Sequence, residues 1–267
     1  MNIQEGHYGS ALQASLCNGF EAITRLLIQN GPDVNVQGEH GNAIQAALFW
    51  GDERLAKCLI EDGADVNGQG EPYGKALQAA IFLGDEVTAK ILIENGADVN
   101  AQGGEYGNAL QASLYNGHKA ISKLLIGTGA DVNVPGGYYG NVLQAALYEG
   151  QEEIAKLLIE NGAHVNAQGG YYGTALQAAS SNGQEAIAKL LIENGVDVNS
   201  QGGRFGNALQ AALPDGHEAI ARLLIDNGAD VNTQEGPYGN ALQAPLFWEN
   251  EAIIKLLMEN GADVNAH

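Results

Sequence analysis

Five residues in the middle of the chain carry side chains that could take part in acid–base chemistry: Tyr148, Glu149, Tyr172, Arg204 and Asp215. A carboxylate beside an aromatic ring can act as a general acid or base. Arg204 could pair with Asp215 or with an anionic group of a ligand. These residues are widely spaced in the sequence, so any shared chemistry depends on the elements that position them.

Histidines and cysteines give little support for metal or thiol chemistry. The six histidines form no HxxxH or HExxH pattern, and no Cys/His cluster has the spacing of a zinc site. Cys58 takes the place of a leucine and is expected to be buried, and Cys17 has no evident partner base. The Gly-rich turns, such as Gly103-Gly104, do not fit a phosphate-binding loop. We therefore expect neither a bound metal nor a cofactor.

The charge balance indicates which partners the chain would attract. Its 267 residues include 12 basic and 32 acidic side chains, a formal net charge of −20. Such a charge repels phosphate backbones, so nucleic acid is not expected as a partner, whereas basic peptides or protein faces would be attracted at low salt. No segment approaches the roughly 18 apolar residues of a membrane helix, and residues 1–6 do not resemble a signal peptide. Together with the absence of a disulfide framework, this favours a cytoplasmic or nuclear location and no membrane contact.

Eight glutamines reveal an internal repeat. Each follows a leucine or an isoleucine, and they recur every 33 residues, once after 32: Gln13, Gln45, Gln78, Gln111, Gln144, Gln177, Gln210 and Gln243. We expect a single array over 1–267, with repeats at approximately 8–39, 40–72, 73–105, 106–138, 139–171, 172–204, 205–237 and 238–267.

Each repeat is predicted to contain two short helices. In the fourth repeat, Asn108 is a good N-cap for a helix over 109–115, which Gly117 ends. A second helix is predicted over 118–129, with Gly129 as its left-handed C-cap. Helices of about a dozen residues or fewer are not stable alone, so stacking on neighbouring repeats must supply the burial.

The second helices carry a regular charge pattern. Eight of the twelve basic residues occupy one position, and seven of them follow a glutamate at i,i+4: Glu21–Arg25, Glu53–Lys57, Glu86–Lys90, Glu152–Lys156, Glu185–Lys189, Glu218–Arg222 and Glu251–Lys255. This pattern is typical of a solvated outer helix face, and it leaves little positive charge for the opposite face.

An asparagine recurs in the loop that follows each second helix. The eight residues are Asn35, Asn67, Asn100, Asn133, Asn166, Asn199, Asn232 and Asn265. Asparagine side chains readily bond backbone groups in turns, so we expect each to bond a turn backbone.

These features resemble the ankyrin repeat over roughly residues 6 to 267. The shared features are the 33-residue period, the Gly-His at Gly117-His118 that opens the second helix, the Leu-Leu pair and the sequence Gly-Ala-Asp-Val-Asn. In place of the family's Thr-Pro-Leu-His stands Asn-Ala-Leu-Gln, as at Asn108–Gln111, where Asn would cap the helix and Gln would bridge backbone groups. This variant is similar to long arrays of filamentous fungi.

The resemblance implies an all-α, L-shaped solenoid of eight helix-turn-helix units joined by short β-turn or hairpin loops. First helices and loop tips would line a concave face, and second helices would form the convex back. Family members mostly bind proteins through the concave face and are not enzymes as a rule.

Repeat-to-repeat variation locates the expected binding groove. Aromatic residues end the first helices of repeats two to five, whereas small or polar residues follow in repeats six and seven, a step that would leave a pocket beside Tyr148. The candidate groove residues are Phe49, Trp50, Phe82, Tyr115, Tyr138, Tyr148, Tyr171, Tyr172, Ser181, Arg204 and Asp215. The recurring tip aromatics Tyr139, Tyr172 and Phe205 are interpreted mainly as tip-to-tip stacking, and packing between repeats is an alternative for the helix-end aromatics.

We therefore expect a scaffold that binds a basic protein or peptide in an acidic, aromatic concave groove centred on repeats four to seven. The alternatives are a small-molecule-binding protein and a non-typical enzyme that uses Glu149, Asp215, Tyr148, Tyr172 and Arg204 in that pocket. Apolar faces at the array ends would promote end-to-end self-association. Pro245 would add to fraying, because proline costs about 3 kcal/mol in an ordinary helix interior.

Overall fold

The computed structural model describes residues 10–38, 41–49, 52–70, 74–103, 107–135, 139–234, 236, 239–247 and 249–265. The chain divides into two compact units, residues 1–131 (unit 1) and 132–267 (unit 2), which are described separately. Within the described residues, no helix is long and apolar enough to cross a lipid bilayer.

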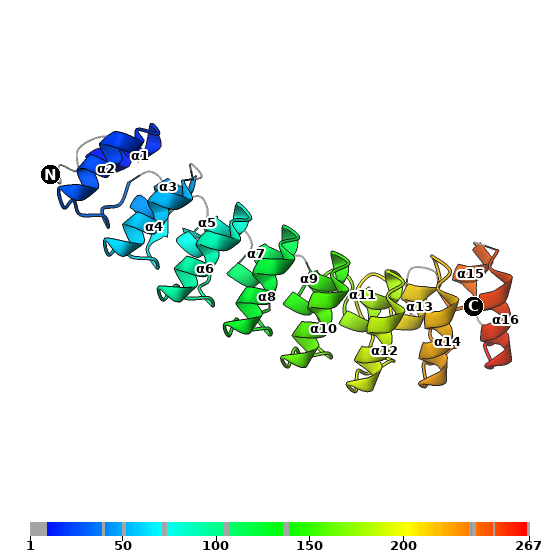
Figure 1. Ribbon diagram of the computed structural model, residues 1–267. Coiled ribbons are helices and arrows are strands. Elements are labelled where there is room, and N and C mark those ends of the chain that lie inside the picture. Colours follow the sequence, from blue (N-terminus) through cyan, green and yellow to red (C-terminus); the bar gives the residue numbers. More distant parts are fainter. Residues whose placement is uncertain are drawn as a thin grey trace. The chain divides into compact units, whose positions relative to one another are not determined.

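Unit 1 consists of four helix pairs, drawn from blue to green in Figure 1. The first helices are α1 (Ala11–Cys17), α3 (Ala43–Phe49), α5 (Ala76–Phe82) and α7 (Ala109–Tyr115). The second helices are α2 (Glu21–Gln29), α4 (Glu53–Glu61), α6 (Glu86–Glu94) and α8 (Lys119–Gly127). First helices of successive repeats pack on one another, and α6 packs on both α4 and α8.

Unit 2 repeats this arrangement, from green to red in Figure 1. Its first helices are α9 (Val142–Tyr148), α11 (Ala175–Ser181), α13 (Ala208–Ala212) and α15 (Gln243–Phe247). Its second helices are α10 (Glu152–Glu160), α12 (Glu185–Glu193), α14 (Glu218–Asp226) and α16 (Glu251–Glu259). The second helices stack in sequence order, α10 on α12, α12 on α14 and α14 on α16.

In the fourth repeat, the ends of the first helix, α7, are those predicted from the sequence, and the ends of the second helix, α8, differ from the prediction. The Asn108 side chain accepts a hydrogen bond of 2.8 Å from the Gln111 N–H, and Gly117 has φ 73°, so the predicted cap and stop of α7 are confirmed. The second helix is shorter than predicted at both ends. His118 is its N-cap residue, Thr128 is its C-cap residue, and Gly129 follows with φ 92°, where the left-handed turn leads the chain away.

The core of each unit is a row of small and branched side chains shared between repeats. First helices bury alanines and leucines on nearly every side, and the second helices from α4 onward bury a leucine at the same position, such as Leu59, Leu125 and Leu158. Helices of five to nine residues could not persist without this burial, because nucleating so short a helix is unfavourable. The stacking expected from the repeat is therefore what stabilises the helices.

The recurring glutamine connects a repeat to the next one. Gln45 accepts the Asn42 N–H at its side-chain oxygen (2.8 Å), and its Nε2 donates to the carbonyls of Gly68 (3.0 Å) and Gly74 (2.8 Å) in the following loop. Gln177 makes equivalent bonds in unit 2, including one of 2.9 Å to the Gly206 carbonyl. The expectation that glutamine bridges backbone groups is confirmed, and the groups bridged belong to adjacent repeats.

The loop asparagines also connect successive repeats. Asn100 Nδ2 donates to the Gly129 carbonyl (3.2 Å), and Asn100 Oδ1 accepts the Asp131 N–H (2.7 Å), both one repeat later. The bond within the turn is instead made by aspartate, since Asp98 Oδ1 accepts the Asn100 N–H (3.0 Å). The prediction that the asparagine side chain bonds a turn backbone is therefore confirmed for Asn100, and the turn that it bonds belongs to the end of the following helix pair.

Short hairpin-like contacts close the long loops, as predicted. In unit 1, β1 (Gln69–Gly70) pairs antiparallel with β2 (Gly74–Lys75), with Gln69 opposite Lys75. In unit 2 the same place holds single bridges, such as Gly169 with Gly173 and Gly202 with Gly206.

Prolines shorten two first helices of unit 2. α13 ends at Ala212 because Pro214 has no N–H to continue the helical bonding. α15 begins only at Gln243, so Pro245 lies in its first turn, where an N–H has no intrahelical acceptor. The helix therefore avoids the interior penalty expected for Pro245 by starting late.

Candidate binding surface

Aromatic rings of unit 2 form a continuous cluster across three successive loops. The aromatic cluster comprises Tyr139, Tyr148, Tyr171, Tyr172 and Phe205. Ring centroids are 4.5 Å apart for Tyr139 and Tyr148, and 5.8 Å apart for Tyr148 and Tyr172. Tyr171 meets Tyr172 edge-on at 5.1 Å, and Phe205 stacks on Tyr172 at 6.0 Å with an interplanar angle of 19°. These are favourable aromatic geometries, and the last confirms tip-to-tip stacking for this pair.

Glycines allow the loops that carry these rings to pack closely. A Cβ at Gly203 would overlap the carbonyl of Tyr172, and a Cβ at Gly170 would overlap that of Tyr139. The Arg204 N–H donates to the Tyr171 carbonyl at 3.0 Å, which ties one loop to the one before. The aromatic positions therefore align one repeat after another because the loop backbones touch.

Arg204 lies on the cluster. Its guanidinium carbon is 5.4 Å from the Tyr171 ring centroid and 5.7 Å from that of Phe205, and its Nη1 donates to the Tyr171 hydroxyl. Cation–π contacts of this kind hold an arginine in place at a partly exposed site. Among the described residues, Arg204 contacts Tyr171 and Phe205 and makes no ion pair with Asp215, so of the two roles considered for Arg204 the pairing with Asp215 is not observed.

Polar contacts attach the cluster to the first helices. The Tyr139 hydroxyl donates to Glu149 Oε1 at 2.8 Å, just beyond the end of α9. The Tyr172 hydroxyl donates to Asn182 Oδ1 at 3.3 Å, and Asn182 Nδ2 donates to the Leu147 carbonyl at 3.1 Å. Loop tip and helix end are therefore one connected assembly.

Members of the cluster differ in exposure, and this separates their roles. Tyr172 is buried, with only 7% of its surface accessible, so it supports the assembly from within. Tyr148 is exposed, Tyr139, Tyr171 and Phe205 are half-buried, and Arg204 is exposed. A partner would thus meet Tyr148, the edges of the half-buried rings and the Arg204 guanidinium.

The remaining predicted groove residues are distributed over both units. Phe49, Phe82 and Tyr115 end α3, α5 and α7 in unit 1; Phe49 is half-buried, and the other two are exposed. Trp50 and Tyr138 lie outside the described residues.

Of the five residues in the acid–base hypothesis, Tyr148 and Tyr172 are members of the aromatic cluster, and Arg204 and Glu149 contact it. Glu149 contacts Tyr139, and Asp215 is exposed with no hydrogen bond to Glu149 or Arg204 within the part of the chain that the structure describes. Ser181, beside the expected pocket, is half-buried, and its carbonyl lies 3.2 Å from His217 Nε2. Over the same described residues, no three side chains of His, Cys, Asp or Glu are grouped as they would be around a metal ion.

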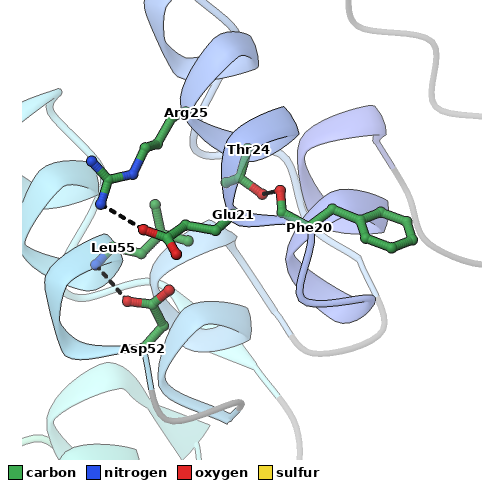
Figure 2. A network of polar contacts seen from close by, with 6 residues as sticks. All are labelled: Phe20, Glu21, Thr24, Arg25, Asp52 and Leu55. Carbon is green, nitrogen blue, oxygen red and sulfur yellow. Dashed lines mark hydrogen bonds and ion pairs between the residues drawn. The ribbon is translucent and has the colours of Figure 1, made fainter.

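The second helices carry exposed charge pairs. Figure 2 shows Arg25 and Glu21 one turn apart on α2, with an N–O distance of 2.6 Å. Arg222–Glu218 (3.0 Å) and Lys255–Glu251 (3.9 Å) also confirm predicted pairs. Lys90 lies 4.0 Å from Glu94 rather than pairing with the predicted Glu86. At exposed positions such ion pairs contribute little to the free energy of unfolding. They do show that these basic side chains are paired with glutamates on the second helices.

Two members of the cluster, Tyr139 and Phe205, were expected mainly to stack at the tips. Tyr139 also contacts the helix-end tyrosine Tyr148, and Phe205 also supports Arg204. Their shared spacing with Tyr172 is visible in the sequence. The convergence with Tyr148 depends on how far each loop folds back over its helix, which the spacing does not show.

Comparisons with known proteins agree with this architecture. A family model described as "Ankyrin repeats (3 copies)" matches residues 76–169, 135–202 and 176–267, so the matches extend from residue 76 to 267. A solved structure, the human ASB11 ankyrin repeat domain, has 23% sequence identity and a TM-score of 0.64, covering 83% of this chain and 99% of that one. At this identity the similarity shows the fold alone, and no curated protein matches. The chain is an all-α repeat solenoid and belongs to the ankyrin-repeat family.

Proposed function

We propose that this protein is a scaffold that binds a basic protein or peptide, with the aromatic cluster and Arg204 of unit 2 at the centre of its binding surface. Ankyrin-repeat domains generally mediate protein–protein interactions. The observation that carries the more specific proposal is the connected row of rings with Tyr148 exposed beside them. Exposed aromatic and arginine side chains on a rigid support are typical of binding hot spots.

The preference for a basic partner follows from the charge distribution. The chain has a net charge of −20, and apart from Arg204 the basic residues of unit 2 all lie on the second helices: Lys156, Lys189, Arg222 and Lys255. Arg204 itself is engaged with two rings and a hydroxyl. A basic ligand would therefore approach an acidic surface with few competing cations.

Binding should depend on the net charge of the partner and on salt. The probe is a series of labelled peptides that share aromatic and aliphatic content but differ in net charge. The most basic peptides are expected to bind most tightly, and their affinity should fall as salt rises, because long-range attraction is screened. Fluorescence anisotropy measures both effects. Salt-independent binding, or a preference for the acidic peptides, contradicts the basic-partner proposal.

A matched pair of substitutions locates the surface. Tyr148 and Phe82 both end a first helix and have similar exposure, 41% and 37%. Tyr148→Ala should weaken binding of the best peptide by about 2 kcal/mol, roughly a 30-fold rise in Kd, whereas Phe82→Ala should leave it nearly unchanged. If Phe82→Ala weakens binding and Tyr148→Ala does not, the surface lies in unit 1.

We also propose that the protein self-associates through its first and last helix pairs. Apolar side chains are exposed at both places, including Leu26 on α2 and Met258 on α16. Exposed apolar surface promotes association. Sedimentation velocity over a range of concentrations should show growth beyond the monomer, and a monomer at every concentration would contradict this proposal.

A further inference from the structure

In the first three repeats of unit 2, one polar residue precedes the glycine of the turn between the two helices. We call these the helix-end residues, and each lies ten residues after the tip aromatic of its own repeat. They are Glu149 in the fifth repeat, Asn182 in the sixth and Asp215 in the seventh. All three are exposed, so their different contacts decide which of them can meet a ligand.

In the fifth and sixth repeats, the tip tyrosine bonds the helix-end residue. The Tyr139 hydroxyl donates to Glu149 Oε1 at 2.8 Å, and the Tyr172 hydroxyl donates to Asn182 Oδ1 at 3.3 Å. The main-chain N–H groups of these two helix-end residues also donate to the carbonyls four residues earlier, both at 3.1 Å. Both residues are therefore held within the protein by their side chains and by their main chains.

The seventh repeat has neither contact. Its tip residue is Phe205, whose ring has no hydroxyl to donate. Pro214 interrupts α13, which ends at Ala212, so the helical bond that would hold the next residue is not formed. Over the residues that the structure describes, Asp215 makes no hydrogen bond and no ion pair. Two substitutions in one repeat thus leave its carboxylate without an internal partner.

The basic residues of unit 2 leave the negative charge of Asp215 unpaired. The Arg204 guanidinium is held over the Tyr171 ring, 5.4 Å from its centroid, and donates to the hydroxyl of that tyrosine. The other basic residues of unit 2 lie on the second helices: Lys156, Lys189, Arg222 and Lys255. An ammonium or guanidinium group from outside could therefore donate charge-assisted hydrogen bonds to the Asp215 carboxylate.

Asp215 lies in the repeat that carries one end of the aromatic cluster. Phe205 of the same repeat stacks on Tyr172 at 6.0 Å, and Tyr172 lies 5.8 Å from Tyr148. Pro214 is half-buried and stands where the fifth repeat has the exposed Tyr148. A peptide that contacts Tyr148 and extends toward the seventh repeat would thus meet a smaller side chain followed by an exposed carboxylate.

We propose that Asp215 binds a lysine or arginine side chain of the bound peptide, and that Phe205 and Pro214 make it available by withholding its internal partners. This inference rests on the basic-peptide binding proposed above and assigns the residue that recognises the cation. The ion pair would form at an exposed position, so its loss should raise Kd by about two- to fivefold.

Phe205→Tyr tests the proposal without changing the net charge. The added hydroxyl should donate to Asp215, as Tyr139 donates to Glu149, and compete with the peptide. The Kd of the most basic peptide should therefore rise by about two- to fivefold. Fluorescence anisotropy at fixed salt measures this, with peptides acetylated at the N-terminus and amidated at the C-terminus so that only side chains carry charge. Circular dichroism with thermal unfolding checks the fold.

Asp215→Asn should give a similar rise in Kd, and its control is Asp226→Asn. Asp226 is exposed at the end of α14, so this control removes the same charge from a second helix. It should leave Kd nearly unchanged, because a distant exposed charge is screened by salt.

Substitution of each peptide lysine by glutamine identifies the cation that Asp215 binds. At one position, glutamine should raise Kd for the unsubstituted protein but not for Asp215→Asn, because residues in contact show this coupling. Arginine at that position should retain the affinity, since guanidinium also pairs with carboxylate.

Three results would overturn this inference while leaving the proposed function in place, provided that Tyr148→Ala still weakens binding. The first is that Asp215→Asn raises Kd no more than Asp226→Asn. The second is that no peptide lysine is coupled to Asp215. The third is that Phe205→Tyr leaves Kd unchanged, which would mean that the missing hydroxyl is not what makes Asp215 available. If no peptide of the series binds, the proposed function fails, and this inference fails with it.

Discussion

At the scale of single residues, the conformation of the turn between the two helices decides which side chain is tolerated. Gly150, Gly183 and Gly216 hold this turn with φ between 65° and 73°, a left-handed conformation that costs an L-residue about 1–2 kcal/mol. The last repeat has Glu249 there, with φ 56°, the one non-glycine residue with positive φ among those the structure describes. The last helix pair therefore carries backbone strain that the others do not.

Removing this strain should stabilise the last repeat. Glu249→Gly is expected to raise the free energy of unfolding by about 0.5–1 kcal/mol, since part of the relieved strain is offset by the greater freedom of glycine in the unfolded chain. Urea denaturation measures the change, and amide exchange in α16 assigns it to the last pair. The control is Gly150→Ala, where a Cβ would meet no other atom, so only the backbone conformation opposes it. Gly150→Ala should lower the free energy of unfolding by about 1 kcal/mol. An unchanged free energy of unfolding in both variants would contradict the backbone strain inferred at Glu249.

At the scale of elements, much could be predicted from sequence because each helix carries its own signals. Asn108 caps α7 and Gly117 ends it, and both are local properties of the chain. The start of α8 could not be predicted exactly, because it depends on the geometry of the turn before it. The start of α15 depends on Pro245, which destabilises the helix least when it lies in the first turn. The partners of Asn100 were missed because its bonds reach a backbone one repeat away.

The asparagine bonds should contribute measurably to the junction between repeats. Asn100→Ala removes two inter-repeat hydrogen bonds, so it should lower the free energy of unfolding by about 1–2 kcal/mol. Asn265→Ala is the matched control, because it follows the last helix pair, and it should have little effect at low protein concentration. Equal losses from the two substitutions, measured in urea under the same conditions, would contradict the assignment of stability to the junction.

At the scale of the whole molecule, the candidate surface could be predicted only in part. Tyr148, Tyr171 and Arg204 were identifiable because they lie where the repeats vary, and Tyr139, Tyr172 and Phe205 because they recur at the repeat spacing. Their assembly into one cluster depends on loop backbones that touch at Gly170 and Gly203. Because the net charge is −20, added salt should weaken the binding of a basic peptide but strengthen self-association, in which like-charged copies repel one another. Salt titration alone can therefore separate ligand binding from self-association.

The most direct test of the binding proposal is amide hydrogen exchange with and without the most basic peptide of the series. The expected result is slowed exchange in the parts of unit 2 that carry the aromatic cluster: residues 139–149, 171–173 and 203–206. Protection should be absent in Tyr148→Ala at the same peptide concentration, because loss of that ring lowers occupancy. Protection confined to the second helices α10, α12 and α14, or confined to unit 1, would show that the aromatic cluster is not the binding surface.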